Sequence, residues 1–264
     1  MSDSAPDPVT GPSDSSAAPA PTPKASPPRR SVTAAVPRRV PDTYWLLQGA
    51  TLLVFDLLGG LYVRGEENVP QNGPVLLVAN HISYLDPPAI GDASPRRVVF
   101  MAKHELFQIK PLSWLLRGVD AFPVRRGEPD RAAFKNTLAM LAEGRVVCIF
   151  PEGGRQLEGD LGVAEPGAAL FALKTGCPVV PVFVENTNRM LDERGRLHRA
   201  RVMVTFGVPF TFPTRKTDRE TLDAAGKELM AAIARTRDAR EAMPPARRIR
   251  PHWIRKPREG SRTR

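Results

Sequence analysis

The residues that could do chemistry are concentrated in one short stretch, Asn80-His81-Ile82-Ser83-Tyr84-Leu85-Asp86. An imidazole and a carboxylate, five residues apart, follow directly on the apolar run Val75–Ala79, which is typical of a buried strand. Five helical residues would turn Asp86 about 140° away from His81. Pro87 also disfavours a helical conformation for Asp86. A turn, rather than a helix, is therefore expected to bring the two side chains together.

Such a pair suits general-base catalysis. The carboxylate would hold one ring nitrogen of His81, and the other nitrogen would take a proton from a substrate hydroxyl. A structural interpretation is also open, because Asp at the N-cap and Pro at the first helical position are both favoured, so that Asp86 could simply cap a helix that starts at Pro87. These residues alone do not decide between the two.

Two further polar turns are expected at strand ends. Arg125-Arg126-Gly127 follows an apolar run at 121–124, and Pro151-Glu152-Gly153-Gly154-Arg155 follows another at 145–150. In open α/β sheets, sites collect beyond the carboxyl ends of the strands. We therefore expect a base, cations and a carboxylate to meet at one edge of a sheet.

The remaining elements alternate between strands and helices, which favours an α/β fold with a mixed sheet flanked by helices. Pro111 is expected to divide residues 107–116 into two short helices. Pro181, inside the apolar run 178–184, indicates an edge strand or a bulge. A capping box at residues 217–220 predicts a helix that buries Leu222, Leu229, Met230 and Ile233.

Length and composition favour one folded domain, predicted at residues 64–236 of the 264. The net charge of +10 calls for an anionic partner or surface. The basic C-terminal region contains one Trp and no known nucleic-acid module, so nucleic acid is not the expected partner. Cys148 and Cys177 are expected to be reduced thiols of the core in a cytosolic compartment, and neither belongs to a metal-binding motif.

Both ends of the chain differ from this domain. Residues 1–41 contain ten of the 28 prolines and are predicted to be disordered, without the apolar core of a secretory signal. Residues 42–63 are predicted to form an apolar helix that contacts a membrane, although a buried core helix is the alternative. Asp56 would be costly at bilayer depth, which favours a helix dipping into one leaflet. Residues 237–264 are predicted to be a basic disordered tail.

The ordered set of motifs resembles the 1-acylglycerol-3-phosphate acyltransferase family of phospholipid synthesis. The family's signatures are Asn-His, four residues and Asp; a strand ending in an arginine before glycine; a Phe-Pro-Glu-Gly turn; and a later Val-Pro-Val strand. The corresponding residues here are Asn80 to Asp86, Arg126-Gly127, Phe150 to Gly153, and Val180 to Val182.

The resemblance implies a single acyltransferase domain, with His81 as the base and Asp86 as its orienting partner. It implies substrate contacts by Arg126, Glu152 and Gly153, and we add Arg155, Lys103 and Arg125 as cations suited to a phosphate. Arg125 stands where the family commonly has an acidic residue.

The resemblance also implies the substrates. The acyl donor would be acyl-CoA or acyl carrier protein, attacked directly without an acyl-enzyme, and no metal or bound cofactor is expected. The acceptor would be a lysophospholipid, foremost 1-acyl-sn-glycerol-3-phosphate, or alternatively another lysolipid or glycolipid. The expected location is the cytoplasmic face of the cell membrane, peripheral or monotopic. A lipid hydrolase using Ser83 remains the alternative of another class, although no Gly-x-Ser-x-Gly elbow surrounds Ser83.

Overall fold

The structure is a computed structural model that describes residues 44–125, 130–156, 160–213 and 217–250. All of these belong to one compact unit, Pro37–Arg264. The predicted disordered tail, residues 1–41, lies outside the described residues.

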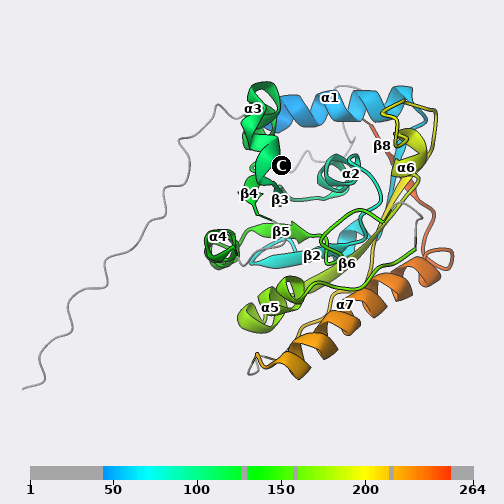
Figure 1. Cartoon of the computed structure of the whole chain (residues 1–264). Helices are drawn as coiled ribbons and strands as arrows, with labels where there is room; N and C mark the ends of the chain where they lie inside the picture. Colours follow the sequence, from blue (N-terminus) through cyan, green and yellow to red (C-terminus); the bar gives the residue numbers. More distant parts are fainter. Residues whose placement is uncertain (1–43, 126–129, 157–159, 214–216, 251–264) are drawn as a thin grey trace, which may run out of the picture. The chain divides into compact units, whose positions relative to one another are not determined.

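An eight-stranded mixed sheet organises this unit, in the order β4-β3-β5-β2-β6-β7-β1-β8 (Figure 1). Five neighbouring strands are parallel: β4, β3, β5, β2 and β6. Strand β7 is antiparallel to β6, β1 is parallel to β7, and β8 is antiparallel to β1. The strand bounds are Leu61–Arg64 (β1), Val75–Ala79 (β2), Val98–Lys103 (β3), Phe122–Val124 (β4), Val146–Ile149 (β5), Val179–Glu185 (β6), Val202–Phe206 (β7) and Arg247–Ile249 (β8). The predicted α/β class with a mixed sheet is confirmed.

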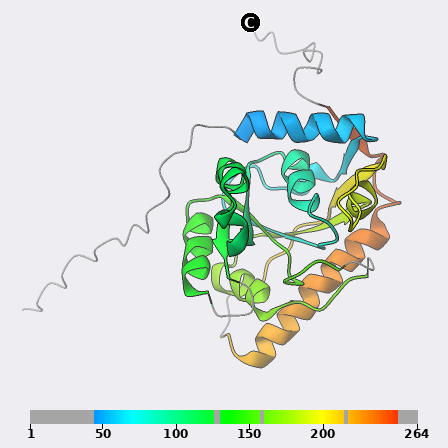
Figure 2. The same ribbon diagram turned by 45° about the horizontal axis from the view of Figure 1, so that its top comes forward.

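Helices cover both faces of the sheet, because the parallel strands are apolar on both sides. In β2, Val75, Leu77 and Ala79 pack into one core cluster, while Leu76 and Val78 pack into a second. The first cluster includes α1 and α2, and the second includes α4, α5 and α7. Figures 1 and 2 both place α1 on the opposite side of the sheet from α7. The helix bounds are Tyr44–Leu57 (α1), Asp86–Ala93 (α2), Lys110–Gly118 (α3), Arg131–Ala142 (α4), Pro166–Thr175 (α5), Thr187–Met190 (α6) and Arg219–Ala239 (α7), with single 3₁₀ turns at Glu66–Asn68 (η1) and His104–Gln108 (η2).

Local signals explain where several helices begin and end. Pro111 lies in the first turn of α3, directly after η2, so the predicted division into two short helices is confirmed. Helix α5 ends at Gly176, which adopts the left-handed conformation that favours glycine. Helix α7 is capped by Asp218, whose Oδ1 accepts from the Thr221 N–H at 2.8 Å. The predicted helix is therefore present, with the cap one residue later than the start of the expected box.

The edge position that Pro181 suggested is wrong, because β6 lies between β2 and β7 in the interior of the sheet. The Pro181 carbonyl accepts from the Gly207 N–H at 2.8 Å, so the proline nitrogen also faces this neighbour. The pairs Val182↔Phe206 and Val179↔Phe210 span three residues on β6 and four on the partner, which is the count of a bulge. The missing N–H therefore faces an irregular part of the ladder.

The predicted apolar helix of residues 42–63 is shorter than expected. Helix α1 ends at Leu57, and Leu61–Arg64 is strand β1, paired with β7 and β8. The reason is the pair Gly59 and Gly60, which have φ values of 127° and 99° that break a helix. Within the described residues, no helix has both the length and the apolar character needed to cross a bilayer.

The predicted disordered tail from residue 237 is also wrong over its described part. Helix α7 continues to Ala239, and β8 pairs with β1 through Ile249. Four arginines of this region form ion pairs, namely Arg237 with Asp238, Arg240 with Glu185, Arg247 with Glu66 and Arg248 with Asp56. Much of the apparent basic excess is thus matched by acids of the folded unit, while residues 251–264 lie outside the described part.

Candidate active site

The turns that follow the parallel strands all lie at the carboxyl edge of the sheet. Strand β2 ends before the turn of His81, β5 before the turn of Glu152, and β6 before Asn186 and Thr187. Because β2 lies between β5 and β6, these three turns are neighbours in space. The predicted meeting of polar turns therefore follows from the parallel order of the strands.

His81 and Asp86 form a hydrogen-bonded pair. The distance from His81 Nδ1 to Asp86 Oδ2 is 2.8 Å. The Asp86 side chain is fully buried, and His81 is exposed by only 6%. The turn between strand and helix thus brings together the two residues that a continuous helix would have separated.

Asp86 does not cap α2, so the structural alternative for this carboxylate is not realised. Asp86 is the first residue of the helix, and the N-cap is Leu85. Its Oδ2 accepts from the backbone N–H groups of Ile82 at 2.6 Å and Ser83 at 2.8 Å, as well as from His81. These bonds close the turn around the carboxylate and hold it against the imidazole.

Thr187 completes the surroundings of Asp86, and sequence reasoning missed it. Its hydroxyl donates to Asp86 Oδ1 at 2.5 Å, and its side chain is fully buried. Asn80, the first residue of the His81 motif, has a structural role of its own. Its side chain donates to the Val184 carbonyl at 3.0 Å and accepts from the Val184 N–H at 2.7 Å. Thr187 also follows a strand end, so the rule that indicated the other turns could have indicated it.

Glu152 supports the His81 turn from the neighbouring strand. Its Oε2 accepts from the His81 backbone N–H at 2.8 Å, and its Oε1 accepts from the Gly162 N–H at 3.2 Å. Burial raises the pKa of this carboxyl above its usual value. Both oxygens are thus used inside the protein, which makes Glu152 a positioning residue, and its contact with the acceptor stays a prediction.

Gly153 has a φ of 66°, and a Cβ there would lie 2.7 Å from Glu165 Cγ. Position 153 therefore requires glycine on two grounds, conformation and space. The close backbone approach of a substrate that the resemblance implied stays a prediction.

A largely apolar groove of about 690 Å³ opens at His81. It is lined by residues from α1, α2, β3, η2 and α3, together with Phe150 at the end of β5. The Phe150 ring stacks on the His81 ring, with centroids 4.1 Å apart. Nδ1 of His81 is bonded to Asp86, and over the described ranges no hydrogen bond is made by Nε2. The groove has the volume and apolar lining of a small-molecule site.

Two of the predicted cations line this groove, Lys103 at the end of β3 and Arg155 after β5. Lys103 Nζ lies 3.3 Å from Glu105 Oε1, and both side chains are about half exposed. The Arg155 guanidinium lies over the Tyr84 ring, 3.8 Å from its centroid. Arg125 is exposed and does not line the groove, whereas Arg126 lies outside the described residues.

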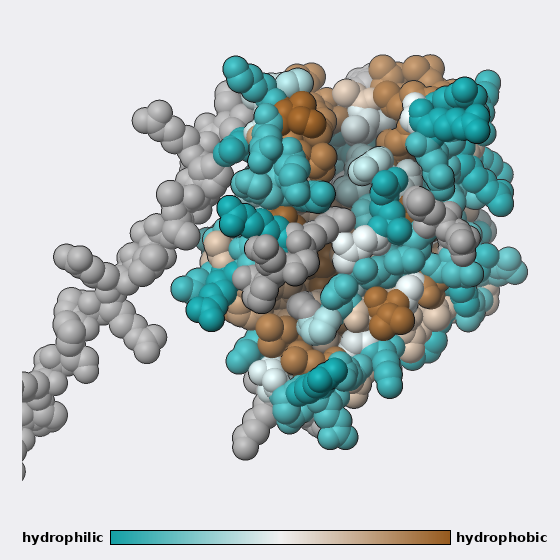
Figure 3. All heavy atoms as spheres, in the orientation of Figure 1, coloured by the Kyte–Doolittle hydropathy of each residue, from teal (hydrophilic) through white to brown (hydrophobic). Residues whose placement is uncertain are grey.

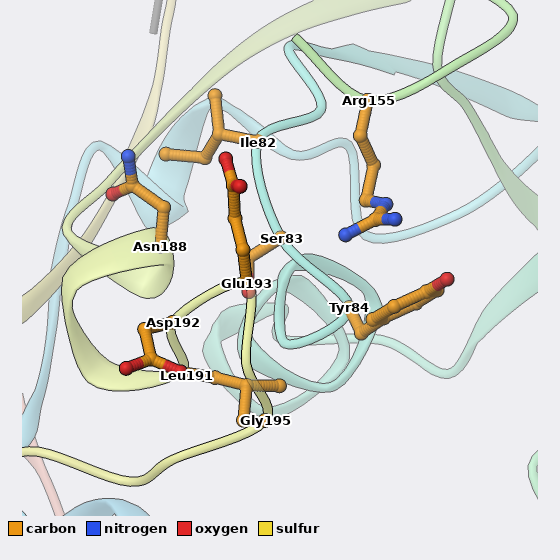
Figure 4. A pocket seen from close by; sticks show the side chains of 9 residues that line it. All are labelled: Ile82, Ser83, Tyr84, Arg155, Asn188, Leu191, Asp192, Glu193 and Gly195. Carbon is orange, nitrogen blue, oxygen red and sulfur yellow. The ribbon is translucent and has the colours of Figure 1, made fainter. Parts of the chain in front are cut away.

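A second hollow of about 460 Å³ shares Tyr84 and Arg155 with the groove. Figure 4 shows Glu193 reaching across it toward Ile82, with Arg155 over the Tyr84 ring at one side. Ser83 lines this hollow, but its side chain is buried and its Oγ accepts from the Leu85 N–H at 3.3 Å. Among the described residues, Ser83 makes no hydrogen bond to His81.

The two cysteines, Cys148 and Cys177, are free and buried. Burial raises the pKa of both thiols, which keeps them protonated and unreactive.

The known proteins reported below as similar to this chain are acyltransferases. The acyltransferase family pattern matches residues 60–185. The chain is 31% identical over 157 residues to the 1-acyl-sn-glycerol-3-phosphate acyltransferase of Bacillus subtilis, covering 58% of this chain and 78% of that protein. It is 28% identical over 197 residues to the Streptococcus pneumoniae enzyme of the same name, covering 73% and 72%.

A solved structure is also similar. The 1-acyl-sn-glycerophosphate acyltransferase PlsC of Thermotoga maritima matches with a TM-score of 0.58 and 25% identity, covering 73% of this chain and 78% of that chain. The helix-flanked mixed sheet is therefore shared with a protein of this type. Together with the Bacillus subtilis relative, it shows that this chain belongs to the 1-acyl-sn-glycerol-3-phosphate acyltransferase family and is an acyltransferase of that type.

Proposed function

We propose that the protein moves a fatty acyl group from an acyl thioester, acyl-CoA or acyl carrier protein, to the free hydroxyl of a lysophospholipid. The acceptor in this proposal is 1-acyl-sn-glycerol-3-phosphate, and the product is phosphatidic acid. One observation carries the proposal: His81, hydrogen-bonded to the buried Asp86, lines a largely apolar groove.

His81 is the general base of the proposed reaction. Its Nε2 takes the proton of the acceptor hydroxyl while the hydroxyl oxygen attacks the thioester carbonyl. Asp86 keeps the ring in the correct tautomer and balances the charge of the imidazolium. The tetrahedral intermediate then expels the thiolate, which takes the proton back from His81. No acyl-enzyme forms, and the only cofactor-like component is the thioester co-substrate.

The groove holds the acyl chain of the donor in this proposal. Its walls are side chains of α1, α2, β3 and α3, which would remove the methylene groups of the chain from water. Each methylene buried in this way contributes about 0.8 kcal/mol. His81 is one of the lining residues, so a chain lying in the groove can bring its carbonyl carbon to the base.

The phosphate of the acceptor would be bound by Arg155 and Lys103, which line the groove, together with Arg126. A guanidinium group can donate to two phosphate oxygens at once, whereas an ammonium acts as a point charge. Arg155 is already oriented by stacking on Tyr84. Arg125 is proposed as a weaker, more distant contributor.

We further propose that α1 contacts the membrane with its outer face. Leu46, Leu53, Val54 and Leu57 are exposed by 69%, 42%, 42% and 66%, and their spacing places them on one side of the helix. Trp114 and Ile109 of the neighbouring α3 region are also about half exposed. Figure 3 shows hydrophobic surface along the top of the view, where Figure 1 draws α1 and α3. Contiguous exposed apolar surface of this kind marks an interaction site.

Asp56, which made deep insertion costly, is ion-paired with Arg248 at 2.8 Å. Its charge is therefore matched on the protein side of α1, and the outer face stays apolar. This arrangement supports shallow binding to a membrane. We propose the cytoplasmic face of the cell membrane as the location, with peripheral or monotopic association.

The test is mass spectrometry of the products formed by the purified full chain. It would be incubated with acyl-CoA or acyl carrier protein donors and a panel of lysophospholipids, beside a His81→Ala control. Phosphatidic acid formed by wild type and not by the control supports the proposal. Release of free fatty acid without acyl transfer, abolished by Ser83→Ala, would instead support the hydrolase alternative. The buried position of Ser83 and its bond to Leu85 speak against that alternative.

A further inference from the structure

The groove is lined by two groups of polar residues. His81, Lys103 and Arg155 belong to strand ends, whereas Thr51 and Asp92 are hydrogen-bonded between α1 and α2, and Tyr44 and Gln48 line the groove from α1. Apolar side chains also line it, including Phe100, Leu106, Leu112, Leu116 and Val119. A cavity for a plain hydrocarbon chain needs polar groups only near the reacting atoms, so the second group calls for an explanation.

Helix α2, which connects β2 to β3, spans the distance between the two groups of polar residues. Helix α2 leaves the carboxyl end of β2 and returns the chain to the start of β3. Asp86, bonded to His81, is its first residue, and Asp92 follows six residues later, about 9 Å along the helix axis. Asp92 is thus about that far along α2 from the catalytic pair, on a helix that lines the groove.

Asp92 is 92% buried, since its relative exposure is 8%. Among the described residues, its hydrogen-bond partner is Thr51 of α1, whose Oγ1 lies 2.7 Å from Asp92 Oδ2. Within the same described ranges, no ion pair with Asp92 is present. Burial raises the pKa of this carboxyl well above its ordinary value.

A neutral carboxyl can donate as well as accept. The Thr51 hydroxyl also lies 3.1 Å from the Leu47 carbonyl and 3.0 Å from the Gln48 carbonyl. The Thr51 hydroxyl has a single hydrogen. It can donate this hydrogen to a carbonyl and keep its bond to Asp92 only if the carboxyl group donates to Thr51, and the protonated form of Asp92 can do so. The pair would then present a carboxyl oxygen to the groove as an acceptor for a further donor.

A simple link between α1 and α2 would account for the Thr51–Asp92 bond. It does not account for the position of both residues on the groove wall, beside the Gln48 amide. Three hydrogen-bonding side chains gathered at the distal part of an apolar cavity match a ligand that carries a polar group there. A chain without such a group leaves them facing methylenes.

We propose that Asp92, Thr51 and Gln48 form a subsite for a hydroxyl group on the distal part of the donor acyl chain, so that the enzyme prefers hydroxylated acyl thioesters. This rests on the proposed function, in which the groove holds the donor chain. The subsite adds specificity because a hydroxyl that enters the groove loses its bonds to water and regains them only at these residues. Sites built to bond a hydroxyl discriminate more strongly than apolar pockets do.

The experiment compares kcat/KM for four donors with one fixed lysophospholipid acceptor. The donors are dodecanoyl-CoA and its 3-hydroxy, 8-hydroxy and 12-hydroxy derivatives. The 3-hydroxyl stays near the thioester and serves as the matched control for polarity alone. We expect the wild type to use the 8-hydroxy or the 12-hydroxy donor about five- to tenfold better than the plain donor, the worth of one net hydrogen bond. The 3-hydroxy donor should gain nothing.

Two variants locate the effect. Asp92→Asn keeps a neutral group that donates and accepts, and it should retain the preference. Asp92→Leu should reverse it, since the distal hydroxyl would then be buried without a partner.

A wild-type ratio of one or less for both distal hydroxyl donors overturns the inference without any variant. An unchanged preference in a folded Asp92→Leu protein also overturns it. Absence of turnover with every donor would instead count against the proposed function.

Discussion

Thr187 and Asp86 meet from different strands: the Thr187 hydroxyl donates to the one carboxylate oxygen that the His81 turn leaves free. Asp86 thereby accepts four hydrogen bonds while fully buried, three on Oδ2 and one on Oδ1. Thr187 lies beyond residues 60–185, the part matched by the acyltransferase pattern.

Thr187→Val should therefore lower kcat/KM about tenfold. The valine has nearly the same shape but cannot donate, so Asp86 Oδ1 would be buried without its hydrogen-bond partner. Thr187→Ser keeps the hydroxyl and should stay near wild type. Steady-state kinetics of both variants measures the difference, and an equal loss of rate in Thr187→Ser would mean that Thr187 serves packing alone.

His81→Ala should reduce acyl transfer by about 10² to 10⁴-fold, the usual contribution of a general base. Asp86→Asn should lose most of the activity as well, because an amide holds the ring without balancing its charge. Initial rates with a saturating donor measure both, and circular dichroism confirms the fold. Near-normal turnover by His81→Ala would show that His81 is not the base. A trapped acyl-enzyme that is absent in Ser83→Ala would show that Ser83 acts as a nucleophile.

Arg155→Ala and Lys103→Ala should raise the KM of a phosphate-bearing acceptor more than the KM of the acyl donor. Both cations line the groove, and Arg155 is held over Tyr84. Arg125→Ala is the comparison variant and should have a smaller effect, because Arg125 is exposed and does not line the groove. Steady-state kinetics with each substrate varied in turn gives the comparison. Equal effects on both KM values would contradict a phosphate site.

Replacing Leu46, Leu53 and Leu57 together by Gln should release the protein from phospholipid vesicles even at low salt. These side chains are exposed on one face of α1, so the change removes apolar contact without emptying the core. Vesicle flotation at low and high salt measures the binding. Deleting residues 1–63 would be a poor test, because β1 lies between β7 and β8.

High salt should release little wild-type protein, since salt screens charges and leaves apolar contact intact. The counterpart Leu52→Gln, on the buried face of α1, should destabilise the fold instead. Wild type that floats only at low salt would assign membrane binding to the basic residues.

Asp92→Asn should make the protein more stable than wild type at neutral pH. The Asp92 pKa is raised in the folded state by burial, so the folded protein binds the proton more tightly than the unfolded chain does. Wild-type stability is therefore lost as pH rises from the ordinary value of 3.8 through the raised folded pKa, at about 1.4 kcal/mol for each unit of pKa shift. Urea unfolding of both proteins between pH 4 and 8 measures the difference. A gap that does not widen with pH would show that Asp92 is charged when folded.

Much of the architecture follows from local patterns that a single chain carries. Strand β2 has the predicted bounds, Pro111 lies in the first turn of α3 just after η2, and Gly176 ends α5. These features depend on residues near in sequence, so local rules suffice to predict them. The rule that sites form at the carboxyl ends of strands likewise predicts that one edge of the sheet carries His81, Asp86, Glu152 and Arg155.

The errors came from features that depend on distant partners. Pro181 indicated an edge strand, but the antiparallel β7 covers that side with a bulge. Residues 237–250 looked like a basic tail, yet β8 pairs with β1 and its arginines meet Glu66 and Asp56. Charge counts along a chain do not reveal ion pairs between segments almost 200 residues apart.

The sequence by itself determined the chemistry available to this acyltransferase, because His81 and Asp86 belong to one short turn and their types and spacing can be seen in the sequence. Only the tertiary structure decided that Thr187 bonds to Asp86, that Glu152 holds the His81 backbone, and that apolar residues of α1, α2 and α3 enclose a groove. The physical reason is that core and groove use the same apolar side chains. Only the packing of helices against the sheet decides which of them face a cavity.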